Sequence, residues 1–196
     1  MKRTTTVAIL TAGVLSLSAA CQAQAQDQKD NAMREMIDRG KMLVTLGGCN
    51  DCHTPKIFTP KGPVVDESRA LSGAPSDAKI LPVPDGVLGP DKWGAITTND
   101  LTTWAGPWGV SFARNLTPDV ATGLGSWTEA MFIKALRTGK DMGEGRSILP
   151  PMPWEQIGQL PDSELKAIFA YLKSIKPVKN AIHDPIPPPG APAPGK

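Results

Sequence analysis

Residues 49 to 53 read CNDCH and hold two of the three cysteines and one of the two histidines of this 196-residue chain. The two thiols, Cys49 and Cys52, are three positions apart, so one helical turn would bring them to the same side. His53 follows at once and offers an imidazole nitrogen that can bind iron. Cys-X-X-Cys-His is the attachment signature of c-type haem, in which both thiols bond the porphyrin and the histidine is the proximal iron ligand. We therefore predict one covalently bound haem c here.

Three other chemistries use a closely spaced cysteine pair. A structural zinc ion needs four ligands, and only His183 could add to the three at this site if Cys21 is removed or lipidated. A thioredoxin-like redox pair needs a βαβ pattern, which the flanking sequence lacks. A disulfide between the two cysteines would leave His53 without a role. Haem is the interpretation that uses all three residues.

The sixth position of the iron decides between an electron carrier and a catalyst. Met152 stands in ILPPMPW, where prolines with a fixed φ stiffen the backbone and can hold a thioether in one place. Met142 lies on the preceding loop and is the alternative. The remaining methionines between residues 33 and 131 fall in predicted helices, where packing is the ordinary role. We predict that His53 and Met152 are the two axial ligands of the iron.

Three helices are expected to position these residues. Apolar residues spaced on one helical face predict a helix over 33–47 that runs into the haem motif and stops at Gly47-Gly48. In GSWTEAMFIKALRTGK, residues 125 to 140, Ser126 and Glu129 match a capping box and Gly139 is a stop signal. The third helix, within residues 161 to 177, has Asp162 as its predicted N-cap and ends before Pro177.

Between Thr54 and Pro118, proline and glycine recur every few residues and no apolar period persists. We interpret this stretch as a long irregular insertion between the haem motif and the methionine loop. Residues 60 to 112 contain Trp93, Trp104 and Trp108, which either cover the haem edge or form a docking surface for a partner. Since little strand pattern is visible, the sequence predicts an all-α fold.

The N-terminal 25 residues have the layout of a bacterial export signal, with two basic residues, a short apolar run and the cleavage-site pattern AQA. A rival interpretation uses Cys21 as a lipoprotein site, which would anchor the protein to a membrane. Loss of the signal removes Lys2 and Arg3 and leaves basic and acidic residues in equal number, so nothing favours nucleic acid as a partner. We predict a signal peptide at 1–25, one domain at 26–182 and a Pro-rich disordered tail at 183–196.

With CNDCH and PPMPW placed, the chain resembles class I c-type cytochromes over roughly residues 33 to 178. That resemblance implies that the first and last helices cross, with Gly40 allowing close approach to the FAYL segment at 169–172. A narrower resemblance is to the cytochrome subunits of bacterial periplasmic dehydrogenases, carried by ARNLTPD at 113–119, TGLGSWTEAMFIKALRTG at 122–139 and GRSILPPMPW at 145–154. Many such subunits have two or three haem motifs, whereas this chain has one.

Four residues are candidates to hold the haem propionates, because carboxylates near a buried edge need charged or N–H donors. They are Arg114, Trp127, Arg137 and Arg146. Asn115 and Thr117 could support the same region through loop hydrogen bonds. For each of these arginines a solvated surface role is open as well.

These expectations describe a periplasmic electron-transfer protein rather than an enzyme. Its partners would be redox proteins such as a periplasmic dehydrogenase or a terminal oxidase, and it would meet a membrane only if lipidated at Cys21. Two alternatives remain open: a haem enzyme or ligand sensor in which Met152 is labile, and a subunit that anchors a dehydrogenase complex. No further histidine is placed to serve as a distal acid or base, which favours the electron carrier.

Overall fold

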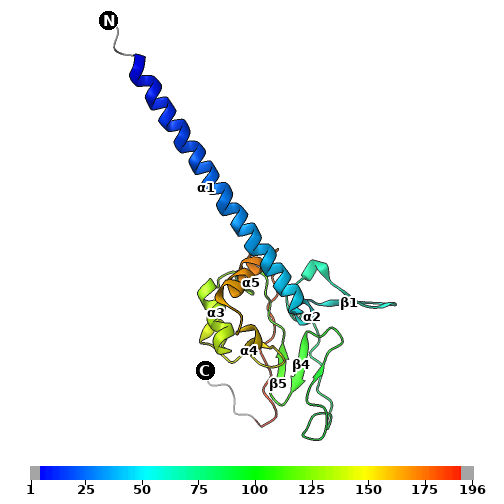
Figure 1. Cartoon of the computed structure of the whole chain (residues 1–196). Coiled ribbons are helices and arrows are strands. Elements are labelled where there is room, and N and C mark those ends of the chain that lie inside the picture. The colour runs from blue at the N-terminus through cyan, green and yellow to red at the C-terminus, as the bar shows by residue number, and fades with distance from the viewer. Residues whose placement is uncertain (1–4, 191–196) are drawn as a thin grey trace.

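The computed structural model describes the backbone of residues 5 to 190 and the side chains of residues 22 to 190. In chain order the helices are α1 (Thr5–Leu46), α2 (Cys49–His53), the 3-10 helix η1 (Glu67–Arg69), α3 (Glu129–Thr138), the 3-10 helix η2 (Asp141–Gly143), α4 (Trp154–Ile157) and α5 (Asp162–Ser174). The strands β1 to β5 all lie between α2 and α3. Figure 1 shows α1 projecting from a domain built around α3 and α5.

The last turns of α1 pack on α5 at a point where α1 could not accept a larger residue than glycine. A Cβ atom at Gly40 would collide with the carbonyl oxygen of Ala167 on α5. Arg39 extends the contact outward, because its guanidinium donates two hydrogen bonds of 2.7 Å to the Glu164 carboxylate. Earlier in α1, residues 22 to 36 are exposed. The apolar face expected from residue 33 is therefore buried only from Ile37 onward.

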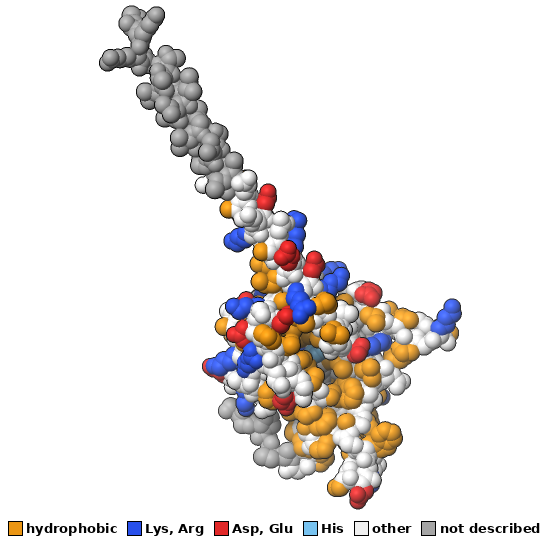
Figure 2. All heavy atoms as spheres, in the orientation of Figure 1, with side chains coloured by type: hydrophobic (Ala, Val, Ile, Leu, Met, Phe, Trp, Pro, Cys, Tyr) orange, Lys and Arg blue, Asp and Glu red, His pale blue; other side chains and the backbone are white. Residues whose placement is uncertain are grey.

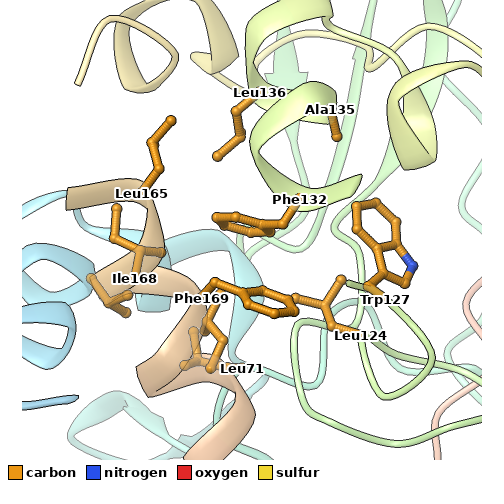
Figure 3. Packing of buried hydrophobic residues seen from close by; sticks show 11 residues of the cluster. Leu71, Leu124, Trp127, Phe132, Ala135, Leu136, Leu165, Ile168 and Phe169 are labelled. Atoms are coloured by element: carbon orange, nitrogen blue, oxygen red, sulfur yellow. The ribbon is translucent and has the colours of Figure 1, made fainter. Parts of the chain in front are cut away.

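Helices α3 and α5 bury their apolar faces against each other and against the end of α1. The rings of Phe132 and Phe169 lie 5.2 Å apart between centroids, and Leu165 is fully buried beside them. Figure 3 shows these side chains meeting Trp127 and Leu124 from the loop that precedes α3. The spacing of apolar residues in α5 follows the 3.6-residue period, so the burial of its apolar face was predictable from the sequence, whereas the apolar residues of α3 spread over more than one face.

Both predicted N-caps are wrong, because each observed N-cap lies one or two residues from the predicted one. Thr128, not Ser126, is the N-cap of α3, and its hydroxyl accepts a hydrogen bond from the Met131 backbone N–H at 3.2 Å. Asp162 is the first residue of α5 rather than its cap, and its carboxylate accepts a hydrogen bond from Arg137 instead. Gly139 ends α3 in the left-handed conformation, with φ 64°, as the sequence predicted.

The expectation of an all-α fold is wrong, because two small antiparallel sheets occupy the region between α2 and α3. Strands β1 (Lys56–Thr59) and β2 (Gly62–Val65) form a hairpin, and β3 (Ile96–Thr97), β4 (Thr103–Gly106) and β5 (Gly109–Phe112) form the second sheet. Figure 1 shows the first hairpin extending away from the domain. Each strand has two to four residues, too few to show an alternating pattern, and Gly and Pro residues obscure it further.

The segment after α5 returns along the domain instead of leaving it. Asn115 and Thr117 are fully buried and hydrogen-bond to the Val178 carbonyl oxygen at 2.8 and 3.2 Å. Further on, Ile186 exchanges two backbone hydrogen bonds with Val110 of β5. This pairing differs from the disordered tail expected from residue 183, while residues 191 to 196 lie outside the described residues.

The predicted signal segment lies largely within α1. Its backbone is helical from Thr5, and side chains up to Cys21 lie outside those described. Within residues 5 to 190, no helix combines the length and hydropathy needed to cross a bilayer. The cleavage site and the lipidation of Cys21 remain predictions.

Candidate functional site

A sharp turn separates the long helix from the cysteine motif. Gly48 adopts φ 63° and ψ 24°, a left-handed conformation that glycine reaches without steric cost, and α2 begins at the next residue. The Asp51 backbone N–H then donates to the Gly48 carbonyl oxygen at 2.9 Å. Cys49, Cys52 and His53 thus lie on one short helix whose direction is fixed by this turn.

His53 is buried, with 8% of its surface exposed, and its ring is oriented by one hydrogen bond. Its Nδ1 lies 2.7 Å from the backbone carbonyl oxygen of Arg114. Because a carbonyl oxygen can only accept, Nδ1 carries the proton and Nε2 of the neutral ring keeps its lone pair. Burial lowers the pKa of His53 and so favours this neutral form. This is the arrangement in which a histidine binds a metal through Nε2.

The carbonyl of Arg114 reaches His53 because two distant segments pair beside α2. The backbone N–H of Ala74 donates to Ala113 at 2.9 Å, and that of Leu116 donates to Leu71 at 2.8 Å. Gly73 lies between them with φ 81°, and any side chain there would collide with the Ala113–Arg114 backbone. The Gly73 N–H in turn donates to the His53 carbonyl oxygen at 2.8 Å. Residues 71–74, which the sequence did not single out, therefore place the histidine.

Both cysteines of the motif are free, partly buried thiols. Burial raises the pKa of each, and for Cys52 the Lys56 ammonium acts in the opposite direction. His183, which a zinc site would have needed as its fourth ligand, instead lies against the ring of Phe112. Among the side chains described, no group of three or more His, Cys, Asp or Glu is arranged to hold a metal ion.

The loop that carries Met152 is held at both ends. The Ser111 hydroxyl on β5 donates to the Pro150 carbonyl oxygen at 2.7 Å, and the Trp154 backbone N–H donates to the Met152 carbonyl oxygen at 2.9 Å. Met152 is partly buried and packs against the same hydrophobic cluster as Cys49. Met142, in contrast, lies in η2 with 42% of its surface exposed. The structure thus brings Met152, and not Met142, to the cluster that Cys49 borders.

Three of the four propionate candidates lie in one neighbourhood near His53. The Arg114 guanidinium lies 4.9 Å from the centroid of the Trp127 ring and donates to the Asp141 carboxylate at 2.8 Å. Arg146 is exposed and lines one cavity with Arg114. This neighbourhood is linked to His53 through the Arg114 backbone.

Arg137 differs from the other candidates. Its guanidinium donates to the carbonyl oxygens of Gly158 and Leu160 and to the Asp162 carboxylate. These acceptors lie on the connection between α4 and α5 and at the first residue of α5, so Arg137 ties α3 to the start of α5. Arg137 therefore joins two parts of the fold. The sequence could not show that its guanidinium N–H groups already have acceptors within the protein.

An apolar surface surrounds the motif. Figure 2 shows hydrophobic side chains gathered on the face of the domain where α2, β4 and β5 lie in Figure 1. Trp104 donates its indole N–H to the Leu101 carbonyl oxygen at 2.8 Å and lies close enough to Cys52 to influence its thiol. Trp93, in contrast, is 69% exposed.

The residues at this site fit a covalent haem. Two free thiols precede a buried histidine whose Nε2 is available, and the surrounding surface is apolar. Arg114 has a buried Nε with no hydrogen-bond partner among the described residues, a donor that a carboxylate could satisfy. The chemistry of this donor set, two thiols and one neutral imidazole beside an arginine, matches what haem c requires.

Comparison with known proteins gives related cytochrome subunits. No protein-family model matches the chain. It is 27% identical over 176 residues to the gluconate 2-dehydrogenase cytochrome c subunit of Pantoea cypripedii, covering 89% of this chain and 30% of that protein. It is 28% identical over 159 residues to the alcohol dehydrogenase (quinone) cytochrome c subunit of Gluconobacter oxydans, covering 80% of this chain and 24% of that protein.

A third relative is a nicotinate dehydrogenase subunit of Pseudomonas putida, with 28% identity over 144 residues, 74% of this chain and 9% of that protein. The chain thus spans less than a third of the length of each of these relatives. The similarity supports the resemblance found in the sequence at the level of a cytochrome c relative.

Sequence reasoning missed Asn180, a buried residue that anchors the C-terminal segment. Its amide donates to the Ser72 and Ala74 carbonyl oxygens at 2.7 and 2.8 Å and accepts from the Ser76 N–H at 2.9 Å. It thereby secures the 71–74 segment on which the position of His53 depends. An asparagine in a Pro-rich stretch gives no local signal of such a role, because all three partners are distant in sequence.

Proposed function

We propose that this chain is a haem-binding electron-transfer protein. More particularly, it is a periplasmic single-electron carrier with one haem c, exchanging electrons with a dehydrogenase and a respiratory acceptor. The observation that carries the proposal is the buried His53 ring, held through Nδ1 directly after two free thiols. The relatives named as cytochrome c subunits of dehydrogenases support the same role.

Each residue of the site has a distinct task in this proposal. Cys49 and Cys52 hold the haem covalently, and His53 and Met152 are its axial ligands. Arg114, Trp127 and Arg146 face the propionates, with Asp141 fixing the Arg114 guanidinium. When bound, haem supplies an iron that gains and loses one electron. A thioether ligand raises the reduction potential relative to two histidines, which suits a carrier that accepts electrons from a dehydrogenase.

The apolar face around α2 suits brief contacts with redox partners. Electron transfer requires that the haem edge approach a partner, and small interfaces that separate quickly are sufficient. Export through the segment 1–25 would place the protein where c-type haem is attached in bacteria. A protein lipidated at Cys21 would carry out the same transfer at a membrane surface.

Haem attachment is the first test. The chain is expressed with a bacterial haem-attachment system, and its mass should exceed that of the exported polypeptide by one haem that acid–acetone does not extract. Replacing Cys49 and Cys52 by Ser should remove the covalent haem. Cys21→Ser is the matched control and should leave attachment unchanged. Extractable haem in the parent protein, or tightly bound zinc in its place, contradicts the proposal.

The sixth ligand is the second test. Met152→Ala should keep the haem attached, lower the reduction potential, and let imidazole or carbon monoxide bind readily. Met142→Ala is the control and should do neither. The iron–sulfur charge-transfer absorption of the oxidised protein decides between them. If it persists in Met152→Ala and disappears in Met142→Ala, the assignment is wrong.

A further inference from the structure

The hairpin formed by β1 and β2 exposes apolar side chains on both of its faces. Ile57 lies opposite Val64 on one face, and Phe58 and Val65 lie on the other. Each of the four has 43% or more of its surface exposed. Within residues 5 to 190 the two strands form a sheet of their own and pack chiefly on each other. A two-stranded hairpin alone is marginally stable in water, so a further contact would stabilise this one.

The hydrogen-bond pattern of the hairpin leaves the outer edge of β1 open. The Asp66 backbone N–H donates to the Pro55 carbonyl oxygen at 2.9 Å, which makes these two residues a hydrogen-bonded pair. Because hydrogen-bonded and non-hydrogen-bonded pairs alternate along an antiparallel ladder, Lys56 and Phe58 turn their backbone N–H and carbonyl groups outward. Among the described residues, no hydrogen bond reaches these four groups. The edge therefore offers two donors and two acceptors to another strand.

The outer edge of β2 is less suited to pairing. Pro63 lies opposite Phe58, so it belongs to a pair whose backbone groups face outward. Proline has no backbone N–H, and it is tolerated at this edge because no neighbouring strand requires one. An added strand would find fewer donors on β2 than on β1, so β1 is the edge that can accept it.

The open edge of β1 is complementary to itself. When two copies pair antiparallel about a two-fold axis at Ile57, Lys56 of each copy lies opposite Phe58 of the other, and all the outward backbone groups find partners. On one face Ile57 then meets Ile57 of the second copy, and Val64 extends this aliphatic row on both sides. On the other face each lysine lies beside an aromatic ring instead of a second lysine, so no like charges are directly opposite.

The same register brings opposite charges together beyond the strands. Continued past β1, it sets Lys61, at the hairpin tip of one copy, beside the end of α2 in the other. Lys61 is exposed, and so is Asp51, the acid of α2. The tip is well defined, because the Thr59 hydroxyl donates to the Gly62 carbonyl oxygen at 2.7 Å and accepts from the Lys61 N–H at 3.2 Å. Charge complementarity thus favours a second copy of this chain as the partner.

We propose that β1 is a dimerisation edge, through which two copies of this chain form one antiparallel sheet in the order β2–β1–β1–β2. The hairpin extends from the domain in Figure 1, so the two domains join the shared sheet at opposite ends. Residues 56–65 make up most of the contact on each copy, fewer than the roughly 20–30 residues of a standard interface. The dimer therefore dissociates on dilution, with a dissociation constant of about 0.1 mM. It holds the hairpin tip of each copy beside the haem motif of the other.

Cysteine cross-linking of the haem-loaded protein, in a Cys21→Ser background, tests the register. Ile57→Cys places the thiols of two copies opposite each other, with Cα atoms about 4.5 Å apart, a separation that a disulfide can bridge. Mild oxidation should therefore give a covalent dimer. Val64→Cys is the matched control, because Val64 is equally exposed on the same face but both β1 strands separate it from its counterpart. It should give less than about a tenth as much dimer.

Sedimentation equilibrium from about 5 µM to 0.5 mM measures the strength of the association. Phe58→Pro removes an outward N–H and leaves the β1–β2 ladder intact, whereas Phe58→Ala loses the same ring and keeps the N–H. The proline variant should associate about tenfold more weakly than the alanine variant.

Three results would overturn the proposal. The first is equal cross-linking of Ile57→Cys and Val64→Cys, and the second is a parent protein that stays monomeric at every concentration. The third is a changed haem spectrum in Phe58→Ala, which would mean that the haem itself covers the hairpin. A chain that takes no haem defeats the proposed function separately, and the cross-linking is then decided in a background in which Cys49 and Cys52 are replaced by Ser.

Discussion

The helices α1, α3 and α5 and the insertion between Thr54 and Pro118 are stabilised in different ways. The helices bury apolar side chains such as Val44, Phe132 and Leu165. The buried residues of the insertion and its flanks are often polar, including Thr54, Ser72, Thr102, Asn115 and Thr117. Their hydrogen bonds connect segments that are far apart in sequence, as those from Asn115 to the Val178 segment do.

This difference shows for which parts of the fold a sequence pattern can predict the structure. A helix buries one face, so its apolar period can be read within a dozen residues. A loop region fixed by buried polar groups depends on partners that can lie anywhere in the chain, and each group must find one. Three pairs of variants and one single substitution test whether the two regions are held together as described.

The largest effect is expected at the contact between α1 and α5. Gly40→Ala places a Cβ against the Ala167 carbonyl, so the helices must separate and the free energy of unfolding should fall by about 3 kcal/mol or more. Gly94→Ala in the insertion is the matched control, because a Cβ there meets nothing within 4 Å, and it should change stability by less than about 0.5 kcal/mol. Chemical denaturation measures both. Equal effects would contradict the close packing of α1 on α5.

The next effect concerns the polar anchoring of the insertion. Asn180→Ala removes three hydrogen bonds and leaves the Ser72 and Ala74 carbonyl oxygens without their partner. The free energy of unfolding should fall by about 2–3 kcal/mol.

Asn99→Ala is the control for this substitution, because Asn99 is exposed. It should leave stability nearly unchanged. Hydrogen exchange should show that Asn180→Ala loosens residues 71–76 and the segment after α5 before it affects α3. Uniform loosening of both regions would mean that the insertion and the helices unfold as one unit.

A smaller effect distinguishes the observed cap of α3 from the predicted one. Thr128→Ala removes the hydroxyl that accepts from the Met131 N–H and should cost about 1 kcal/mol. Ser126→Ala should cost almost nothing, because Ser126 is exposed and precedes the cap. Denaturation of the two variants measures the difference. If Ser126→Ala lowers stability more than Thr128→Ala does, the capping box expected from the sequence is supported instead.

The smallest effect is pH-dependent and lies in the insertion. Hydrogen bonds from Ser68 and Arg69 lower the pKa of Asp66. A lowered pKa contributes stability above the unfolded value of about 3.9, and this contribution is lost as the pH falls through the folded value. Asp66→Asn should therefore lower stability by roughly 0.5 kcal/mol near neutral pH and have no such cost at low pH. Denaturation at several pH values checks this, and a cost that persists in acid would indicate lost packing instead.

In the candidate site, as in the fold, local motifs could be recognised in the sequence and contacts between distant segments could not. Cys49, Cys52 and His53 lie within five residues, so the haem hypothesis comes from a local motif, and PPMPW marked Met152 as the candidate sixth ligand by its local stiffness. The supporting contacts could not be predicted in the same way. The carbonyl that orients His53 belongs to Arg114, and it is placed by pairing with residues 71–74. Likewise, Arg137 resembled the other arginines until its acceptors on the α4–α5 connection were known.

The sequence by itself determined the CNDCH motif, the apolar face of α5 and the glycine stop of α3, because each depends on residues within one or two helical turns. Only the tertiary structure decided the two small sheets, the tautomer of His53 and the return of the C-terminal segment along β5. These features depend on backbone groups and buried polar atoms pairing across long stretches of chain. Such pairings leave no periodic trace in the sequence, since any residue can supply a backbone N–H or carbonyl oxygen except proline, which lacks the N–H.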